Sequence, residues 1–175
     1  MAINYSREEI EVKKILSLNK SWQFCRGGFP PAENAGMQKI DLPHTWNNLD
    51  GQDGGGDYFR GACCYIKKIT LNKKENTLYY LEFYGANSVA NVYVNGAHIG
   101  EHRGGYTLFR FDITGALKNG ENDIAVEVSN FPFPDVIPLT ADFTFFGGIY
   151  REVNLVAVSG AHFSLDDHGS AGVYV

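Results

Sequence analysis

The chain has 175 residues, of which 44% are hydrophobic and 20% are charged, and its formal net charge is −5. This composition is typical of a folded globular protein and excludes a disordered or fibrous chain, while the length fits about one domain. Because the charge balance is acidic and no run of lysines or arginines exceeds two residues, we expect no nucleic-acid partner and no membrane-surface role.

The N-terminal segment and the cysteines bear on the cellular compartment. Residues 1–20 carry charges throughout and lack the apolar stretch of a signal peptide, so we expect a cytoplasmic protein, with export of a longer parent left open. The cysteines are Cys25, Cys63 and Cys64, an odd number without zinc-site spacing. Adjacent cysteines in a strand point to opposite faces, so we expect free thiols, no metal and no cofactor.

Hydrophobic periodicity predicts strands along nearly the whole chain. Helical spacing occurs only at residues 7–16, which we place in a leader covering residues 1–17. Alternating or short apolar runs predict strands at residues 22–25, 38–41, 62–71, 78–84, 89–94, 98–102, 107–111, 123–130, 148–158 and 161–165. Turn residues separate these short runs, which indicates an all-β sandwich. The connections are too long for a meander, which favours a jelly roll.

Two long loops interrupt the strand pattern, one at residues 47–56 and one at residues 132–138. Long loops in a compact domain are often functional. The second loop leads to Asp142, a carboxylate that lies among three phenylalanines in the sequence. Aromatic rings beside a carboxylate are typical of sugar-binding sites. There the rings pack on the apolar faces of the sugar, and the carboxylate accepts hydrogen bonds from its hydroxyls. From composition alone, a structural role for Asp142, such as capping a loop or pairing with Arg151, is the more ordinary interpretation.

Other candidate side chains also have structural alternatives. His44 and Trp46 could stack on a sugar, but such a pair more often closes the edge of a sandwich core. The acidic residues Asp50, Asp53 and Asp57 could bind calcium, which takes several oxygen ligands. Their spacing does not match that of a calcium-binding EF-hand loop, so a solvated loop is the preferred interpretation.

Short motifs follow one another in a fixed order along the chain. They are Leu42-Pro43-His44-Thr45-Trp46, Asp57-Tyr58-Phe59-Arg60-Gly61, Val94-Asn95-Gly96 with Gly100 to Tyr106, Phe111-Asp112-Ile113-Thr114, Gly120-Glu121-Asn122, and Asp142 to Arg151 with its Gly-Gly-Ile-x-Arg ending. Together they resemble the N-terminal domain of glycoside hydrolase family 2, which includes β-galactosidases, β-glucuronidases and β-mannosidases. The resemblance extends from about residue 18 to the end of the chain, and the β-galactosidase branch looks most similar.

The resemblance implies a domain organisation in which sugar binding and catalysis lie on different domains. Residues 18–160 would form a jelly-roll sugar-binding domain, galactose-binding-domain-like in fold. Residues 161–175 would be a linker and the truncated start of an immunoglobulin-like domain. In the family the two catalytic glutamates lie on a separate barrel, so we expect no catalytic residue in this chain. The parent would be a retaining hydrolase of terminal β-D-galactosides in carbohydrate metabolism.

The resemblance also implies substrate-binding residues. An aspartate at the position of Asp142 contacts sugar hydroxyls in the family, and the loop of Asp57 and Tyr58 lies near the same pocket. The expected partners are a terminal galactoside and the remaining domains of the parent chain, and a homo-oligomer is left open. The alternatives are a free-standing lectin-like carbohydrate-binding module and the β-glucuronidase or β-mannosidase branch of the same family.

Overall fold

The computed structural model describes residues 13–50, 57–140, 143–167, 169–170 and 172–174, and the regular secondary structure within them is all β-strand. The strands are β1 (Lys13–Ser17), β2 (Trp22–Arg26), β3 (Gln38–Ile40), β4 (Ala62–Leu71), β5 (Thr77–Phe83), β6 (Val89–Val94), β7 (Ala97–Arg103), β8 (Phe109–Asp112), β9 (Gly120–Ser129) and β10 (Val153–Ser159). Across these described ranges, no helix is long and apolar enough to cross a membrane.

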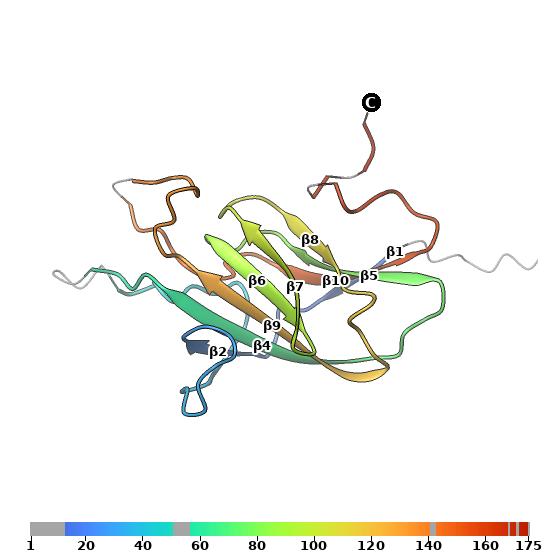
Figure 1. Ribbon diagram of the computed structural model, residues 1–175, viewed down its shortest axis with the longest axis horizontal. Helices are drawn as coiled ribbons and strands as arrows, with labels where there is room; N and C mark the ends of the chain where they lie inside the picture. The colour runs from blue at the N-terminus through green and yellow to red at the C-terminus, as the bar shows by residue number, and fades with distance from the viewer. Residues whose placement is uncertain (1–12, 51–56, 141–142, 168, 171, 175) are drawn as a thin grey trace, which may run out of the picture.

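The strands form two antiparallel sheets packed as a sandwich (Figure 1). One sheet has four strands in the order β1-β10-β5-β8, and the other has six in the order β3-β2-β4-β9-β6-β7. Most neighbours in each sheet are not consecutive in the chain, which therefore crosses repeatedly between the layers. The predicted all-β jelly-roll sandwich is confirmed.

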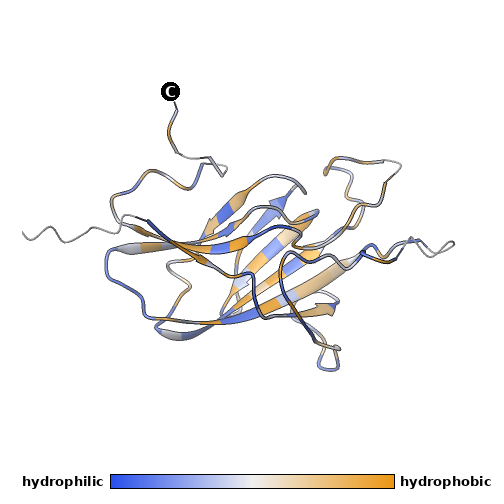
Figure 2. Cartoon of the chain, turned by 180° about the vertical axis from the view of Figure 1, so that it is seen from behind, coloured by the Kyte–Doolittle hydropathy of each residue, from blue (hydrophilic) through white to orange (hydrophobic). Residues whose placement is uncertain are grey.

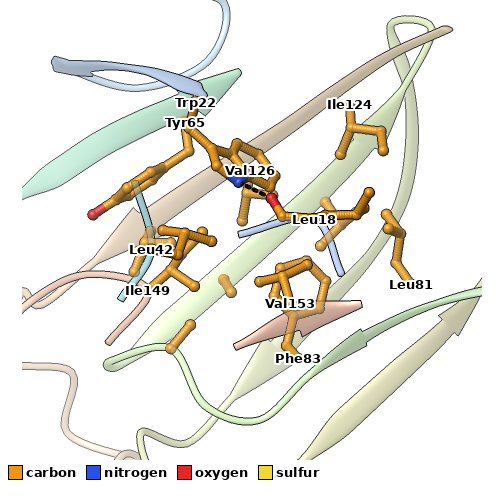
Figure 3. Close-up of a cluster of buried hydrophobic side chains, with 14 of the residues drawn as sticks. Leu18, Trp22, Leu42, Tyr65, Leu81, Phe83, Ile124, Val126, Ile149 and Val153 are labelled. Atoms are coloured by element: carbon orange, nitrogen blue, oxygen red, sulfur yellow. Dashed lines mark hydrogen bonds between the residues drawn. The ribbon is translucent and has the colours of Figure 1, made fainter. Parts of the chain in front are cut away.

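The core fills the space between the sheets because alternate residues of each strand point inward. Along β9, Ile124, Val126 and Val128 are completely buried, whereas Asp123 and Glu127 lie on the opposite face. Figure 2 shows this alternation of hydrophobic and hydrophilic residues along the strands. Trp22 is also fully buried, and its indole Nε1 donates a hydrogen bond of 2.6 Å to the Leu18 carbonyl (Figure 3).

The N-terminal boundary differs from the sequence prediction. Residues 13–17, which we placed in the leader, form β1 and pair with β10, with Leu16 opposite Leu155. All five residues of β1 are exposed. Its sequence therefore lacks the alternation of apolar and polar residues by which a half-buried strand is predicted. Its conformation follows from hydrogen bonding to the edge of β10. The remainder of the predicted leader, residues 1–12, lies outside the described residues.

The segment after β10 does not form the predicted strand at residues 161–165. It packs back on the outer face of the four-stranded sheet, where Leu165 is buried against Tyr80, Val156 and Val158. Nearby, the buried pair Arg110 and Glu82 joins this face to the segment, because Arg110 also donates to the Ser170 carbonyl at 2.8 Å. The segment that we expected to be a linker therefore contacts the sandwich.

The three cysteines are free and buried, as the sequence predicts. Cys25 and Cys64 are direct partners across β2 and β4, whereas Cys63 lies on the other face, in the core. Burial raises the pKa of Cys63 and of Cys64 to about 12, because it disfavours the charged thiolate.

This burial predicts low thiol reactivity. The thiolate is the reactive form of cysteine. A thiol with a pKa near 12 is almost entirely protonated at pH 8, so almost no thiolate is present. We expect a colourimetric disulfide reagent to modify none of the three cysteines in the native chain within minutes and all three in concentrated urea. Rapid native modification of Cys63 or Cys64, mapped by mass spectrometry, would contradict the packing described here.

Candidate functional site

Three segments that are far apart in the sequence meet at one end of the sandwich. They are residues 42–50, which follow β3, residues 57–61, which precede β4, and residues 143–150, which precede β10. Side-chain hydrogen bonds of Asn47 join the first segment to the other two. In Figure 1 the loop after β9 and the loop before β4 extend from the same end of the molecule. This end contains the predicted site residues Asp57 and Tyr58.

A buried pair of asparagines holds these segments together. Asn47 and Asn130 are 0% and 4% exposed, and Asn130 Nδ2 donates to Asn47 Oδ1 at 3.1 Å. The same Asn130 amide group donates to the carbonyls of Phe59 and Phe145 at 3.2 and 3.1 Å. Its Oδ1 accepts from the Gly61 backbone N–H at 2.9 Å. One side chain at the end of β9 therefore contacts the backbone of two site segments.

Asn47 completes the arrangement from the third segment. Its Oδ1 also accepts from the Gly147 backbone N–H at 2.7 Å, and its Nδ2 donates to the Phe59 carbonyl at 2.9 Å. A second bond runs from Nδ2 to Asp50 Oδ2 at 3.0 Å, and that oxygen also accepts from the Phe59 N–H. Asp50 thus orders the loop, whereas we expected a solvated residue there.

The Gly147-Gly148 pair is required by close packing at this end. A Cβ atom on Gly147 would lie 2.0 Å from a ring carbon of Trp46, and one on Gly148 would lie 2.4 Å from the His44 carbonyl. Gly148 also has φ of +133°, a conformation that favours glycine. The two glycines therefore allow the aromatic segment after Asp142 to lie directly against the 44–47 segment.

His44 and Trp46 belong to this packing, as the structural interpretation predicts. Trp46 is 6% exposed and belongs to the main core cluster. His44 is half-buried, and its Nδ1 lies 2.9 Å from the Tyr65 hydroxyl. Burial lowers the pKa of His44, so the imidazole is neutral at neutral pH.

The predicted substrate-binding residues fall partly inside the described part of the chain. Asp57 is exposed, and its Oδ1 accepts from the Tyr58 N–H at 2.9 Å. The Arg60 guanidinium lies 4.4 Å from the Tyr58 ring centroid and 5.7 Å from that of Phe145. Asp142 lies outside the described residues. Arg60 thus lies near the rings of both Tyr58 and Phe145, a residue three positions after Asp142.

Arg151 contacts backbone groups in the described part of the chain. It donates to the carbonyls of Tyr84 and Tyr106, at 3.2 and 3.3 Å, and lies near the Tyr150 ring. Its pairing with Asp142 stays a prediction, because Asp142 is outside the described residues. The described residues contain no cluster of three or more His, Cys, Asp or Glu that could hold a metal ion.

Comparison with known proteins identifies the family. The model of the family described as "Glycosyl hydrolases family 2, sugar binding domain" matches residues 38–159. The chain belongs to this family. It is 41% identical to a β-glucuronidase of Bacteroides fragilis over 160 residues, which cover 90% of this chain and 23% of the relative. It is 32% identical to a β-galactosidase of Thermoanaerobacter pseudethanolicus, with 86% of this chain and 22% of the relative covered.

A solved structure supports the same assignment. The crystal structure of a putative β-galactosidase from Bacteroides fragilis superposes with a TM-score of 0.83 at 34% identity. The match covers 91% of this chain and 25% of that protein. The chain therefore spans about a quarter of the length of these members of glycoside hydrolase family 2.

The asparagine pair leads to a prediction for stability. Asn130→Ala leaves the half-buried Gly61 N–H and the Phe145 carbonyl without their partner, which should lower the free energy of unfolding by about 3 kcal/mol. Hydrogen exchange at residues 58–61 and 144–147 should accelerate. Asn34→Ala, at an exposed position, is the control and should cost less than about 0.5 kcal/mol. Equal effects of the two substitutions in urea unfolding would show that the pair does not hold the loops.

Proposed function

We propose that this chain is the sugar-binding domain of a longer retaining glycoside hydrolase, in which it contacts the substrate while another part of the protein performs the chemistry. The observation that carries this proposal is the asparagine pair, which holds the Asp57–Tyr58 loop against the segment that follows Asp142. Family membership supplies the sugar-binding role. Carboxylates and aromatic rings at one end of a sandwich match the chemistry of sugar hydroxyls and ring faces.

We propose Asp142, Asp57 and Tyr58 as the substrate contacts. The two carboxylates would accept hydrogen bonds from sugar hydroxyls, and Tyr58 offers a phenol whose hydroxyl is buried without a hydrogen-bond partner in the described residues. Retaining hydrolysis needs two carboxyl groups about 5 Å apart, one as acid and one as nucleophile. The chain contains no Asn-Glu dipeptide of the kind that carries the acid in the family, so we place both catalytic groups elsewhere in the parent.

Two substrate classes remain as candidates. A terminal β-D-glucuronide comes first, because the relative at 41% identity is named a β-glucuronidase. A terminal β-D-galactoside comes second, since the relative at 32% identity and the superposed structure are named β-galactosidases. We also propose a reducing compartment such as the cytoplasm, which the three free thiols favour.

The experiment uses the full-length protein encoded by the gene. Asp142→Ala and Asp57→Asn should each lower kcat/KM for the preferred nitrophenyl glycoside by about tenfold or more, as expected for a lost hydrogen bond to a charged group. Glu75→Gln, in the turn before β5 and away from the site segments, is the charge-matched control and should leave kcat/KM unchanged.

Two outcomes would overturn this proposal. One is unchanged kcat/KM in both site variants of the full-length protein, which would leave a purely structural domain. The other is turnover of nitrophenyl glucuronide or galactoside by the 175-residue chain alone, above that of a mock purification. Such turnover would mean that the catalytic groups lie within the chain.

A further inference from the structure

The inner face of the six-stranded sheet borders a pocket at one edge. The six-stranded sheet ends in β2 and β3, where Phe24 and Gln38 are register partners and so share one face of the sheet. Phe24 is buried, but Gln38 is exposed. A pocket of ≈ 440 Å³ opens beside these strands, bordered by the 44–48 segment.

The pocket is lined by a combination of rings and polar side chains. The rings of Phe24 and Trp46 are stacked, with centroids 6.3 Å apart and planes inclined by 20°. The polar lining residues are Arg26, Gln38, His44, Thr45 and Asn48. Such a volume falls in the range of small-molecule sites, and rings beside amides and a charged group suit a ligand with apolar faces and many hydroxyls.

Arg26 gives this pocket its charge. Its guanidinium carbon lies 4.7 Å from the Phe59 ring centroid. Among the described residues, no ion pair involves Arg26, in contrast to Arg103 and Arg110. A guanidinium stacked on a ring keeps its in-plane N–H groups available, and their fork geometry matches a carboxylate. The cation therefore favours an anionic ligand.

Several hydrogen-bond donors and acceptors in the pocket have no partner among the described residues. Within the described residues, the Gln38 and Asn48 side chains make no hydrogen bond, so both amides can donate and accept. His44 Nδ1 is hydrogen-bonded to the Tyr65 hydroxyl, which leaves the other ring nitrogen available for a ligand. Trp46 Nε1 is buried and has no partner in the same part of the chain. Buried donors without partners are rare, and each calls for an explanation.

We propose that this pocket is a second saccharide-binding site and that it takes a sugar bearing a carboxylate, a uronic acid residue. Arg26 would pair with the carboxylate, Gln38 and Asn48 would bond to hydroxyls, and the rings would contact the apolar sugar face. Asp57 and Tyr58 do not line the pocket. The site is therefore separate from the proposed substrate contacts and does not depend on them.

The test titrates the 175-residue chain with methyl β-D-glucuronide and follows the backbone and side-chain NH signals by NMR. Uncharged methyl β-D-glucoside and sodium acetate, at matched ionic strength, are the ligand controls. We expect saturable shifts of the Gln38, Asn48 and Trp46 signals with the glucuronide, and binding at least about tenfold weaker with the glucoside, because a charge-assisted bond is lost.

Variants then test whether Arg26 is the group that binds the carboxylate of the glucuronide. Arg26→Gln should weaken glucuronide binding about tenfold, and Gln38→Ala should weaken it without changing the charge. Lys39→Gln removes one positive charge from the opposite face of β3 and should leave the affinity unchanged. Asp57→Asn should leave the affinity measured from the Gln38, Asn48 and Trp46 signals unchanged, which separates this site from the proposed substrate contacts.

Several results would overturn the inference. Equal affinity for the glucoside, or shifts reproduced by acetate, would show that no uronic acid is recognised. Equal losses in Arg26→Gln and Lys39→Gln would reduce the effect to general electrostatics. Loss of binding in Asp57→Asn but not in Arg26→Gln would place the sugar at the other site and support only the proposed function. Absence of saturable binding at concentrations of about 10 mM would also reject the pocket.

Discussion

The hydrogen bond between Asn47 and Asn130 is the interaction on which the arrangement of the site end depends. Both side chains are removed from water, so every donor and acceptor on them must find a partner inside the protein. Besides each other and the Asp50 carboxylate, their partners are backbone groups of Phe59, Gly61, Phe145 and Gly147. The two neutral amides thereby join three segments, alongside direct backbone hydrogen bonds such as those from the His44 and Trp46 N–H groups to the carbonyls of Ile149 and Gly147. Neutral amides do this without the large desolvation cost that a buried ion pair would carry.

The strands were predictable because their residues alternate, and the aromatic Gly-Gly segment was predictable because its motif resembles a known family. The asparagine pair was not, since Asn47 and Asn130 lie 83 positions apart and each looks like an ordinary loop residue. Strand β1 was missed because an exposed edge strand has no apolar face. Asp50 was misjudged because a carboxylate in a glycine-rich loop resembles a solvated one until its partners are known.

The inner face of the six-stranded sheet contributes both to the core and to the pocket beside β2 and β3. The inner residues of β4, β6 and β9, together with Trp22 and Phe24 of β2, form the continuous core. Where β2 ends and β3 begins, the same inner face presents Arg26 and Gln38 to a pocket. Trp46 belongs to both regions, since it packs on Gly147 in the core and lines the pocket. A change at Trp46 would therefore affect both the fold and the inferred second site.

A double-mutant cycle on Asn47 and Asn130 tests the central interaction most directly. The free energies of unfolding of Asn47→Ala, Asn130→Ala and the double variant would be measured in urea at neutral pH. Residues that act as one buried network give a coupling energy of about 1 kcal/mol or more, and this is the result expected here. Additive losses, within about 0.3 kcal/mol, would mean that the two side chains act independently and would contradict the account.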